Sequence, residues 1–479
     1  MEVYHDDDVL QSPAAQRLRQ FIRARRQKWG AGLPDLEVFE RELHEHMMAL
    51  ERELIAQELA RYDVEAELVE VGGVTYRQAL TSPETYLSAA GPVKVERHLY
   101  RPAGRSSKSI CPLELRAGII GGRFTPRAAR QAAFVMAHLT PGEGEALFAE
   151  LGGMRPSRSS LDRLPKRLSE RWEAQRQAWE DALRATECVP DEAQVMTVSL
   201  DGVLVPMKDG GRQAKRHRPD KQAKGPAGYR EAGCGTVVLY DEEGQRLQTV
   251  RYGRMPEPKK VTLCQQLQAE CQSIAALRPD LTLVKLADGA EENWRFLSRL
   301  DLGLAGQSRD DVEIVDFYHA CEHLKRACDA VWGEGNAQGK AEFERLKTLL
   351  KEADDGGEQV IRALKYRARR ARGRRRKRIE TELTYFRNQR GRMQYARYVR
   401  EQLPIASGVV EAACKTLVTQ RMKRSGMAWT QAGGQAVLTL RSLIQSERWE
   451  TAWSLLHADF CQPVGVVNPK HHASPPLVA

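Results

Sequence analysis

Between residues 195 and 319 the sequence switches repeatedly between strand-like and helix-like patterns, in an order that leaves few folds open. Three apolar, β-branched runs come first, and each of the next two strand patterns follows a helical segment. The segments in order are the strand patterns 195–207, 231–244 and 245–254, the helix 261–277, the strand 281–290, the helix 291–300 and the strand 312–320. The β-β-β-α-β-α-β order predicts a mixed sheet flanked by helices.

Two acidic residues lie on these strands, and a third follows later in the chain. Asp201 interrupts the first apolar strand, and a buried carboxylate without a partner costs several kcal/mol, so it must be paired, hydrogen-bonded or bound to a metal. Asp288 follows the fourth strand directly. Glu411 lies near the start of a helix predicted from Ser407 and Gly408, one position too late for a capping box.

The strand and helix order is that of ribonuclease H-like domains, in which acids at these positions converge. The predicted fold class is therefore an α/β ribonuclease H-like catalytic domain, with a mixed five-stranded sheet and an all-α insertion after His319. Two Mg²⁺ or Mn²⁺ ions, roughly 3.5 to 4 Å apart and held by such acids, can drive an in-line phosphodiester displacement.

Each acid also has a plain structural interpretation. Asp201 suits a hydrogen-bonded core acid, Asp288 a turn or helix N-cap residue, and Glu411 a surface pair with Lys415 four residues on. The sequence pattern favours the metal site because all three acids fall in the expected strand order of a basic chain.

Positive charge is concentrated rather than uniform along the chain. Lys and Arg number 74 against 64 Asp and Glu, which gives a net charge of +10, and ten of the fourteen residues in 365–378 are basic. This density favours contact with nucleic-acid phosphates over a merely solvated face. The predicted DNA contacts here are Arg369, Arg370, Arg374, Arg375 and Arg376, and those after Glu411 are Lys415, Arg421, Lys423 and Arg424.

The N-terminal part is predicted to be mainly α-helical with a small β element. Three short helices between Phe124 and Arg171 resemble a helix-turn-helix, although Pro165 is a defect in the third and plain helical packing fits equally well. The DNA contacts predicted there are Arg158, Arg163, Lys166 and Arg167.

The predicted division of the chain has seven parts. They are a helical arm (1–62), a small β element (63–120), the helix-turn-helix-like region (121–190), the catalytic core (191–322), a basic helical insertion (323–400), the last catalytic and C-terminal helices (401–456) and a disordered tail (457–479).

Composition bears on the compartment and on metal or disulfide scaffolds. Nine cysteines are scattered without a C-x-x-C pair, so neither a disulfide framework nor a complete zinc ribbon is indicated. No apolar run approaches the roughly 18 residues of a membrane span, and the acidic start MEVYHDDDVL is unlike a signal peptide. The prediction is a soluble, cytoplasmic, nucleoid-associated protein.

Several blocks together resemble a known family. SLDGV, LADGAEENW, DFYHACEHL, SGVVEAACKTLVTQRMKRSGMAW and RWETAW look like the signature blocks of the ISKra family of bacterial insertion-sequence transposases, over roughly residues 90 to 455. The resemblance implies a DDE enzyme in which Asp201, Asp288 and Glu411 bind the metals. Relatives often carry a four-cysteine zinc element near VKVERHLYRP, whereas only Cys111 remains here.

The DFYH run from Asp316 to His319 is similar to the Asp-x-x-His element of Mutator-like transposases. The similarity implies that His319 contacts the scissile DNA or assists proton transfer, and a hydrogen-bonded structural histidine is the equal alternative.

The predicted function is a DNA transposase that binds terminal inverted repeats as a homodimer or higher oligomer, cuts there and joins the 3′ hydroxyl to target double-stranded DNA. Two alternatives stay open. One is a transposase-derived DNA-binding protein without catalysis, and the other is a ribonuclease H-like nuclease or resolvase. Metal-dependent nicking, and joining as well as cutting, would separate them.

Overall fold

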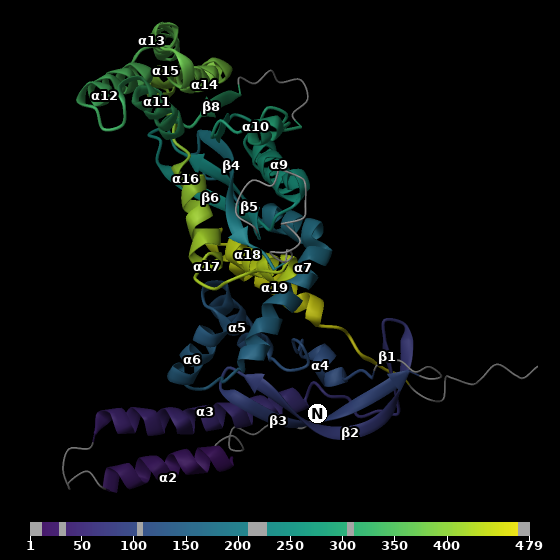
Figure 1. Cartoon of the computed structure of the whole chain (residues 1–479). Coiled ribbons are helices and arrows are strands. Elements are labelled where there is room, and N and C mark those ends of the chain that lie inside the picture. Colours follow the sequence, from purple (N-terminus) through teal and green to yellow (C-terminus); the bar gives the residue numbers. More distant parts are fainter. Residues whose placement is uncertain (1–11, 28–34, 103–108, 209–227, 304–310, 468–479) are drawn as a thin grey trace, which may run out of the picture. The chain divides into compact units, whose positions relative to one another are not determined.

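The computed structural model describes residues 12–27, 35–102, 109–208, 228–303 and 311–467 (Figure 1). The chain forms two compact units, one made of Met1–Gln175 with Glu450–Ala479 and the other of Arg176–Trp449. None of the helices in the described ranges combines the length and the apolar character that crossing a membrane requires.

The first unit contains two N-terminal helices and an antiparallel sheet of order β3-β2-β1-β9. The helices are α2 (Pro13–Gln27) and α3 (Leu36–Ala60), and the strands are β1 (Leu68–Val71), β2 (Val74–Ser88), β3 (Gly91–Pro102) and β9 (Gly465–Val467). The predicted disordered tail from residue 457 is wrong up to Val467, because α19 (Trp449–Phe460) continues the chain and β9 pairs with β1. Residues 468–479 lie outside the described residues.

The same unit holds α4 (Pro112–Arg116), α5 (Pro126–His138) and α6 (Pro141–Leu151), and most of α7 (Arg158–Thr186), which continues into the second unit. The expectation of three short helices is wrong for the third, because α7 has 29 residues and accommodates Pro165 inside it. Six residues separate α6 from α7, more than the short turn of a helix-turn-helix. Leu161, Leu164 and Leu168 are buried, so this face of α7 packs into the unit.

The second unit is built on a mixed five-stranded sheet, as the sequence predicted, and the order of its strands is β6-β5-β4-β7-β8. β5 pairs antiparallel with both β4 and β6, whereas β7 pairs parallel with both β4 and β8. The strands are β4 (Val195–Pro206), β5 (Tyr229–Tyr240), β6 (Arg246–Arg254), β7 (Thr282–Ala287) and β8 (Val312–Val315), and the helices between them are α9 (Val261–Leu277) and α10 (Glu291–Leu297).

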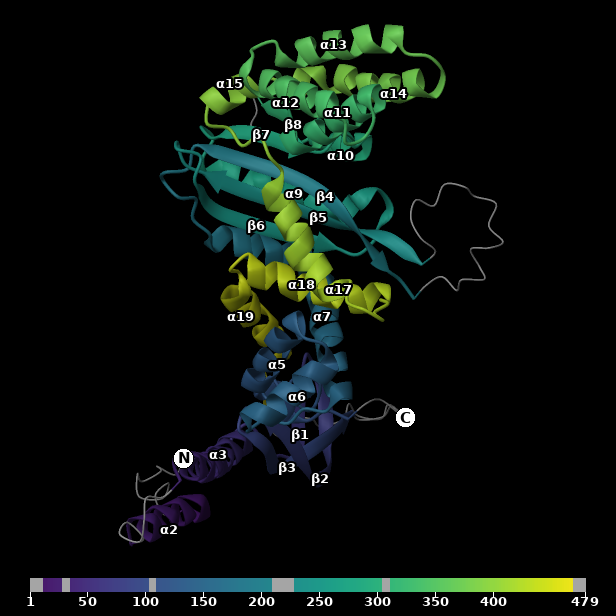
Figure 2. The same ribbon diagram turned by 60° about the vertical axis from the view of Figure 1, so that its left-hand side comes forward.

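The side chains of β4 alternate between two differently covered faces of the sheet. Val198 and Leu200 share a core with Leu263 and Leu267 of α9. Gly235 on β5 allows this close approach, because a Cβ there would lie 2.8 Å from the Leu267 side chain. Figures 1 and 2 show α9 on one side of the sheet and the yellow-green helices leading to α17 on the other.

The opposite face of the sheet is covered by a helix broken into three segments. These are α16 (Gly408–Ala413), a π-helical stretch η3 (Cys414–Thr419) and α17 (Gln420–Met422), and α18 (Gln431–Gln445) follows. Val203 and Val205 of β4 share a second core with Val410 and Leu417. Asp201 has the same parity along β4 as these valines, so its side chain faces α16 and η3.

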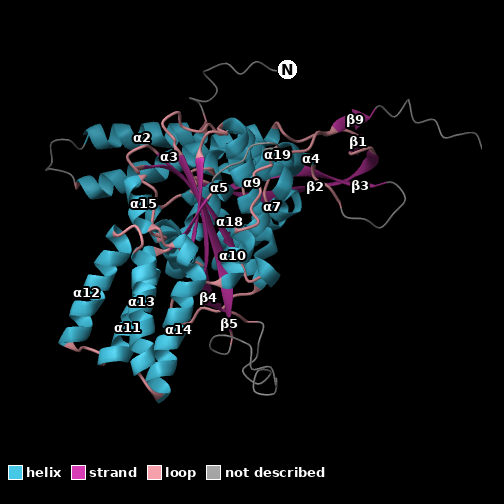
Figure 3. Cartoon of the chain, turned by 90° about the horizontal axis from the view of Figure 1, so that it is seen from above, coloured by secondary structure: helices cyan, strands magenta, loops and turns pink. Residues whose placement is uncertain are grey.

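The chain between β8 and α16 is helical throughout its regular structure, and we call residues 317–400 the helical region. It comprises α11 (Phe317–Trp332), α12 (Ala337–Glu352), α13 (Gly356–Arg370), α14 (Gly373–Gln389) and α15 (Tyr395–Arg400). Seen from above, α11 to α14 lie side by side (Figure 3). Leu324, Leu350 and Leu364 belong to the same core as the sheet, so the helical region and the sheet form one packed body.

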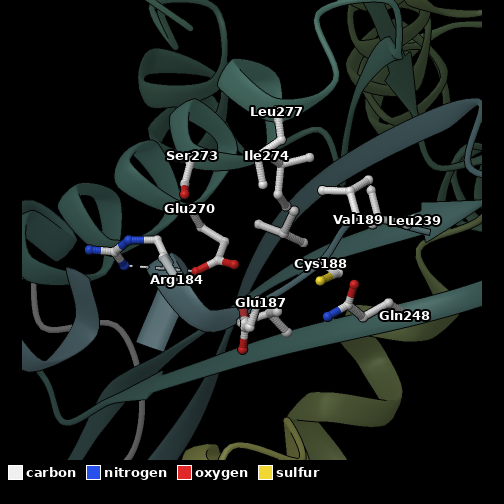
Figure 4. Close-up of a pocket in the computed structure, with 12 residues that line it drawn as sticks. Arg184, Glu187, Cys188, Val189, Leu239, Gln248, Glu270, Ser273, Ile274 and Leu277 are labelled. Carbon is white, nitrogen blue, oxygen red and sulfur yellow. Dashed lines mark ion pairs between the residues drawn. The ribbon is translucent and has the colours of Figure 1, made fainter. Parts of the chain in front are cut away.

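A buried charge network ties α7, α9 and the end of α18 to β6. The Arg448 guanidinium donates to Glu187 Oε1 at 2.5 Å, to Glu270 Oε1 at 2.6 Å and to the Tyr252 hydroxyl at 2.9 Å. Tyr252 in turn donates to Glu270 Oε2 at 2.6 Å, and burial raises its pKa well above the usual value, so it remains a donor. Figure 4 shows Glu187 and Glu270 in this interior, with Arg184 3.8 Å from Glu270.

Replacement of Arg448 by Gln should destabilise the protein strongly. Side-chain exposure of Arg448 is 4% and that of Glu270 is 2%, so the change removes the nearer cation of a buried carboxylate and leaves only Arg184 at 3.8 Å, and breaking a buried pair costs about 3–5 kcal/mol. Urea unfolding would measure the loss. Arg362→Gln is the matched control, because Arg362 and its partner Asp355 are 67% and 55% exposed and exposed pairs contribute little to stability. Equal effects of the two substitutions would contradict the assignment.

Candidate active site

The ends of three parallel strands bring acidic residues to one level of the sheet. Ser199 pairs with Leu286 between β4 and β7, and Ala287 pairs with Val315 between β7 and β8. When this register is continued by one or two residues, Asp288 comes level with Asp201 on one side and with Asp316 on the other. Asp201 and Asp288 were expected from the sequence to converge, and Asp316 joins them.

Asp201 is held within the sheet by short contacts from its neighbours. Its Oδ1 accepts a hydrogen bond from the Gly202 amide at 2.7 Å, and the Cys414 thiol on η3 donates to Oδ2 across 3.5 Å. Burial raises the pKa of Asp201, and the negative charge of Asp288 raises it further. The two carboxylates therefore interact electrostatically, which agrees with their common level in the sheet.

Asp288 organises the turn between β7 and α10. Its Oδ1 accepts from the Ala290 amide and from Asn293 Nδ2, both at 3.1 Å, and Trp294 Nε1 donates to its carbonyl at 2.6 Å. The alternative prediction that Asp288 is a turn residue is thus confirmed for Oδ1, which accepts hydrogen bonds within the turn. Its other carboxylate oxygen, Oδ2, accepts no hydrogen bond from the described residues and stays available.

Glu411 lies in the first turn of α16, where Ser407 is the N-cap residue. The Ser407 hydroxyl does not cap the helix; it donates to Glu411 Oε1 at 2.7 Å, while the Ser407 amide donates to Asp316 Oδ2. Among the described residues no ion pair joins Glu411 to Lys415, so the surface-pair alternative finds no support. Glu411 is exposed and Asp316 is buried, so Ser407 links a core acid to a surface acid.

The three acids share one arrangement of their oxygens. In each, one carboxylate oxygen is fixed by a protein donor; the other faces the weak thiol donor of Cys414 in Asp201 and has no hydrogen-bond donor among the described residues in Asp288 and Glu411. Hard oxygen ligands oriented by outer hydrogen bonds are the donor set that Mg²⁺ and Mn²⁺ take, so the residues fit such ions. The described parts of the chain contain no group of three His, Cys, Asp or Glu side chains arranged to hold a metal, so binding stays a prediction.

His319 does not lie at a strand end as expected, because β8 stops at Val315 and Asp316 caps α11 through the His319 amide at 2.5 Å. The imidazole is one third exposed, with Nδ1 3.8 Å from Glu322. His319 is therefore on the first turn of a helix, next to an acid that is level with Asp288.

Two residues that the sequence did not mark lie close to these acids. Lys260 Nζ lies 2.7 Å from Glu231 Oε1 and donates to Asn293 Oδ1 at 3.1 Å, and its charge partly offsets the rise in the Asp201 pKa. Lys260 also has a left-handed φ of 51°, which is uncommon for a residue with a side chain. Lys259 and Lys260 follow a proline-containing loop, and no pattern in this part of the sequence predicts that Lys260 lies near Asp201.

Tyr385 of α14 is the second such residue. Burial raises its pKa, and so do the charges of Asp288 and Asp316, which places the phenol near both acids. Its hydroxyl is buried and finds no hydrogen-bond partner among the described residues. The ring stacks on His323 at 3.5 Å, and His323 Nδ1 is 2.6 Å from Glu382, so the helical region supplies one wall of the site. In the sequence, a tyrosine at helical spacing is typical of a core position, so the pattern did not indicate that Tyr385 lies near the acids.

The predicted DNA contacts of the second unit separate by exposure. Arg369, Arg370, Arg374, Arg375 and Arg376 are all exposed around the turn from α13 to α14, and Lys415, Lys423 and Arg424 are exposed along the helix after Glu411. The prediction that Arg421 contacts DNA is wrong. Its side chain is 4% exposed, and its guanidinium lies 5.2 Å from the centre of the Trp429 ring. Because it belongs to the interior, it cannot serve as a phosphate contact.

All four residues of α7 that were predicted to contact DNA belong to the first unit. Arg158, Arg163 and Arg167 are exposed, whereas Lys166 is partly buried and pairs with Asp162 at 2.6 Å. Asp201 and Asp288 come level in the sheet of the second unit, and Glu411 lies on α16 of the same unit, whereas these four basic residues belong to the first unit.

No model of a known protein family matches the chain, and no curated protein matches its sequence. The resemblance to the ISKra transposases therefore remains a prediction from the quoted blocks.

Replacement of Asp201 by Asn should stabilise the protein at neutral pH in buffer without divalent cations. A carboxylate whose pKa is raised by folding binds protons more readily in the folded state, so it lowers stability as the pH rises from its unfolded pKa, about 3.9, through its folded pKa. The gain in melting temperature should be full at pH 7 and should shrink as the pH falls toward about 4.

Asp354→Asn provides the control in the same unit, because Asp354 is 78% exposed and its pairing with Arg400 contributes little. A melting temperature for Asp201→Asn that is equal to or below that of the wild type at pH 7 would refute the effect.

Proposed function

We propose that this chain is a divalent-metal-dependent DNA transposase of the DDE type with a ribonuclease H-like catalytic domain. The observation that carries the proposal is the level register of Asp201 and Asp288 on adjacent parallel strands, beneath the helix that bears Glu411. The strand order supports it, since the strand with Asp201 has antiparallel β5 on one side and parallel β7 on the other.

A different neighbouring residue orients each of the three acids. The Gly202 amide, the Asn293 amide group and the Ser407 hydroxyl each hold one oxygen of an acid, so the second oxygen of each, which in Asp201 meets only the weak Cys414 thiol donor, can serve as a ligand. Asp316, which is 1% exposed, fixes Ser407 and the start of α11 together. Two divalent cations bound there would stabilise the charge that develops on the scissile phosphate and on the attacking and leaving oxygens.

His319 and Tyr385 support the proposal as candidate proton-exchanging and hydrogen-bonding groups beside the acids. His319 is partly exposed on the first turn of α11, so its imidazole can exchange a proton near the scissile bond. The phenol of Tyr385 keeps its proton, because burial and the two nearby acids raise its pKa. It can therefore donate a hydrogen bond but not act as a base.

The turn from α13 to α14 supports a DNA partner. Within the part of the chain that the structure describes, Arg374 and Arg375 form no ion pair, although Arg376 next to them pairs with Glu380 at 2.8 Å. Arg367 and Arg370 lie 5.7 and 4.2 Å from the centre of the Tyr366 ring, so Tyr366 is framed by cations while 48% exposed. Unneutralised arginines beside an exposed aromatic ring suit a phosphate backbone. Pairing of two DNA ends would require at least a homodimer.

Asp201→Asn and Glu411→Gln should each abolish metal-dependent cleavage and joining while DNA binding persists. Loss of a metal ligand removes several kcal/mol of transition-state stabilisation, so the rate should fall at least about 10³-fold. The assay is nicking and strand transfer on a plasmid that carries the DNA flanking this gene, with Mg²⁺ or Mn²⁺. Asp354→Asn, exposed and in the same unit, should remain active.

The outcomes separate the candidate functions. Transfer by either mutant would refute the triad. Binding without any cleavage by the wild type would favour a DNA-binding protein that lacks catalysis, and cutting of branched DNA without joining would favour a nuclease or resolvase.

The double variant Arg374→Gln/Arg375→Gln should bind DNA more weakly and with less salt dependence. Each phosphate contact contributes about 0.9 to the slope of log affinity against log salt, so the slope should fall by nearly 2. Fluorescence anisotropy with a labelled duplex at several salt concentrations would measure it. Arg362→Gln, on the same helical region but paired with Asp355, is the control and should change the slope less. An unchanged slope in the double variant would argue against contact at this turn.

A further inference from the structure

A cavity of about 300 Å³ lies wholly within the first unit. It is formed by β2, by the loop Ile120–Phe124 and by the first turns of α7. Arg123 comes from the loop, and Arg163 and Arg167 come from α7, so three guanidinium groups line one small space. All three side chains are exposed, and the cavity is therefore open to solvent.

The charge of these arginines is not neutralised within the unit. Among the residues that the structure describes, the side chains of Arg123 and Arg167 make no ion pair or hydrogen bond, and Arg163 donates only to the carbonyl and hydroxyl of Ser159, at 3.1 and 3.2 Å. The carboxylate that lines the cavity, Glu84, is already bound to Arg97 at 2.6 Å.

A second carboxylate, Glu114, lies near the rim, 3.6 Å from where a Cβ on Gly122 would be. It too is bound to Arg97 and accepts a hydrogen bond from the Tyr86 hydroxyl at 3.0 Å. The two acids near the cavity are thus engaged with Arg97, while Arg123 and Arg167 keep their donors for a ligand and Arg163 keeps those that Ser159 does not take.

The loop that carries Arg123 is fixed by backbone hydrogen bonds. Ile120 and Phe124 exchange both of their hydrogen bonds, at 2.9 and 3.0 Å, and the Leu87 amide donates to the Arg123 carbonyl at 2.7 Å. Gly121 has a φ of 70° and Gly122 a φ of 64°, which glycine adopts readily. A Cβ on Gly121 would come within 3.1 Å of Arg167 Nη1, so glycine also leaves room for that guanidinium.

We propose that this cavity, which we call the arginine cavity, holds a backbone phosphate of DNA. Guanidinium groups present paired donors that match phosphate oxygens, and three of them converge here from two rigid elements. The inference rests on the proposed function for the identity of the polyanion. The sequence predicted that Arg163 and Arg167 contact DNA from a helix-turn-helix. The arginine cavity instead assigns them to the sugar-phosphate backbone of DNA, where a contact positions the protein but does not recognise the base sequence.

The test measures DNA binding by the full chain in EDTA, where no cleavage interferes. Arg123→Gln and Arg167→Gln should each weaken binding of a labelled duplex by about tenfold or more, because each removes charged hydrogen-bond donors from the phosphate. Each should also lower the salt slope by about 1. Arg167→Lys should keep the slope but recover only part of the affinity, since lysine lacks the paired donors.

Arg23→Gln on α2 is the matched control, because it removes the same charge from an exposed arginine of the same unit that does not line the cavity. Circular dichroism would confirm that each variant is folded. If Arg123→Gln and Arg167→Gln bind DNA as tightly as Arg23→Gln does, or if all three weaken binding equally, the arginine cavity is not a phosphate site for DNA.

Inorganic phosphate distinguishes the source of the anion. Competition by phosphate beyond that of chloride at equal ionic strength, lost in the Arg123→Gln/Arg167→Gln double variant, would support the cavity as the contact. Phosphate binding that needs both arginines while DNA affinity does not would identify a small-anion site and overturn the DNA assignment. Cleavage that depends on Asp201 with unchanged binding by the cavity variants would refute this inference alone, and cavity-dependent binding without cleavage by the wild type would refute the proposed function alone.

Discussion

The second unit depends on a carboxylate placed where an apolar side chain would be more stable. Asp201 lies in the central strand between β5 and β7, and burial together with the charge of Asp288 disfavours its ionised form. The neighbours compensate only in part: one amide and one thiol contact its oxygens, and Lys260 lies close enough to lower its pKa somewhat. A group kept in this condition is typical of a site that needs negative charge for its chemistry.

The chain beyond the sheet is tied back to this place by Asp316. One of its oxygens caps α11 and thereby starts the helical region, and the other receives the Ser407 amide, where that region ends. The Phe317 amide also donates to the Ile405 carbonyl at 2.9 Å, so the two crossings of the chain are joined twice. Both ends of the helical region are therefore held at the same place beside the sheet. These contacts bring Asp316 and Ser407, which are ninety-one residues apart in the sequence, together.

The sequence was sufficient for the features that rest on local pattern and was insufficient where tertiary contacts decide. The alternation of apolar runs predicted all five strands of the mixed sheet, and it placed Asp201 within a strand and Asp288 after one. It missed Lys260 and Tyr385, because their proximity to the acids comes from side-chain contacts between separate elements. It also misjudged Gly465–Val467, since three residues of Gly and Val form a strand only through pairing with β1.

Basic residues illustrate the same limit, because a count of positive charges does not reveal which are available. Arg421 and Arg424 belong to one basic run of sequence, yet the first is buried against Trp429 and the second is exposed. Arg163 and Arg167 were singled out as readers of a groove, but a long helix packed through Leu161 and Leu164 directs them to a cavity shared with Arg123. Acidic partners also determine which basic residues are available. Lys166 is paired with Asp162, whereas its neighbour Arg167 forms no ion pair among the described residues. Burial and pairing, rather than density along the chain, therefore determine where a polyanion can bind.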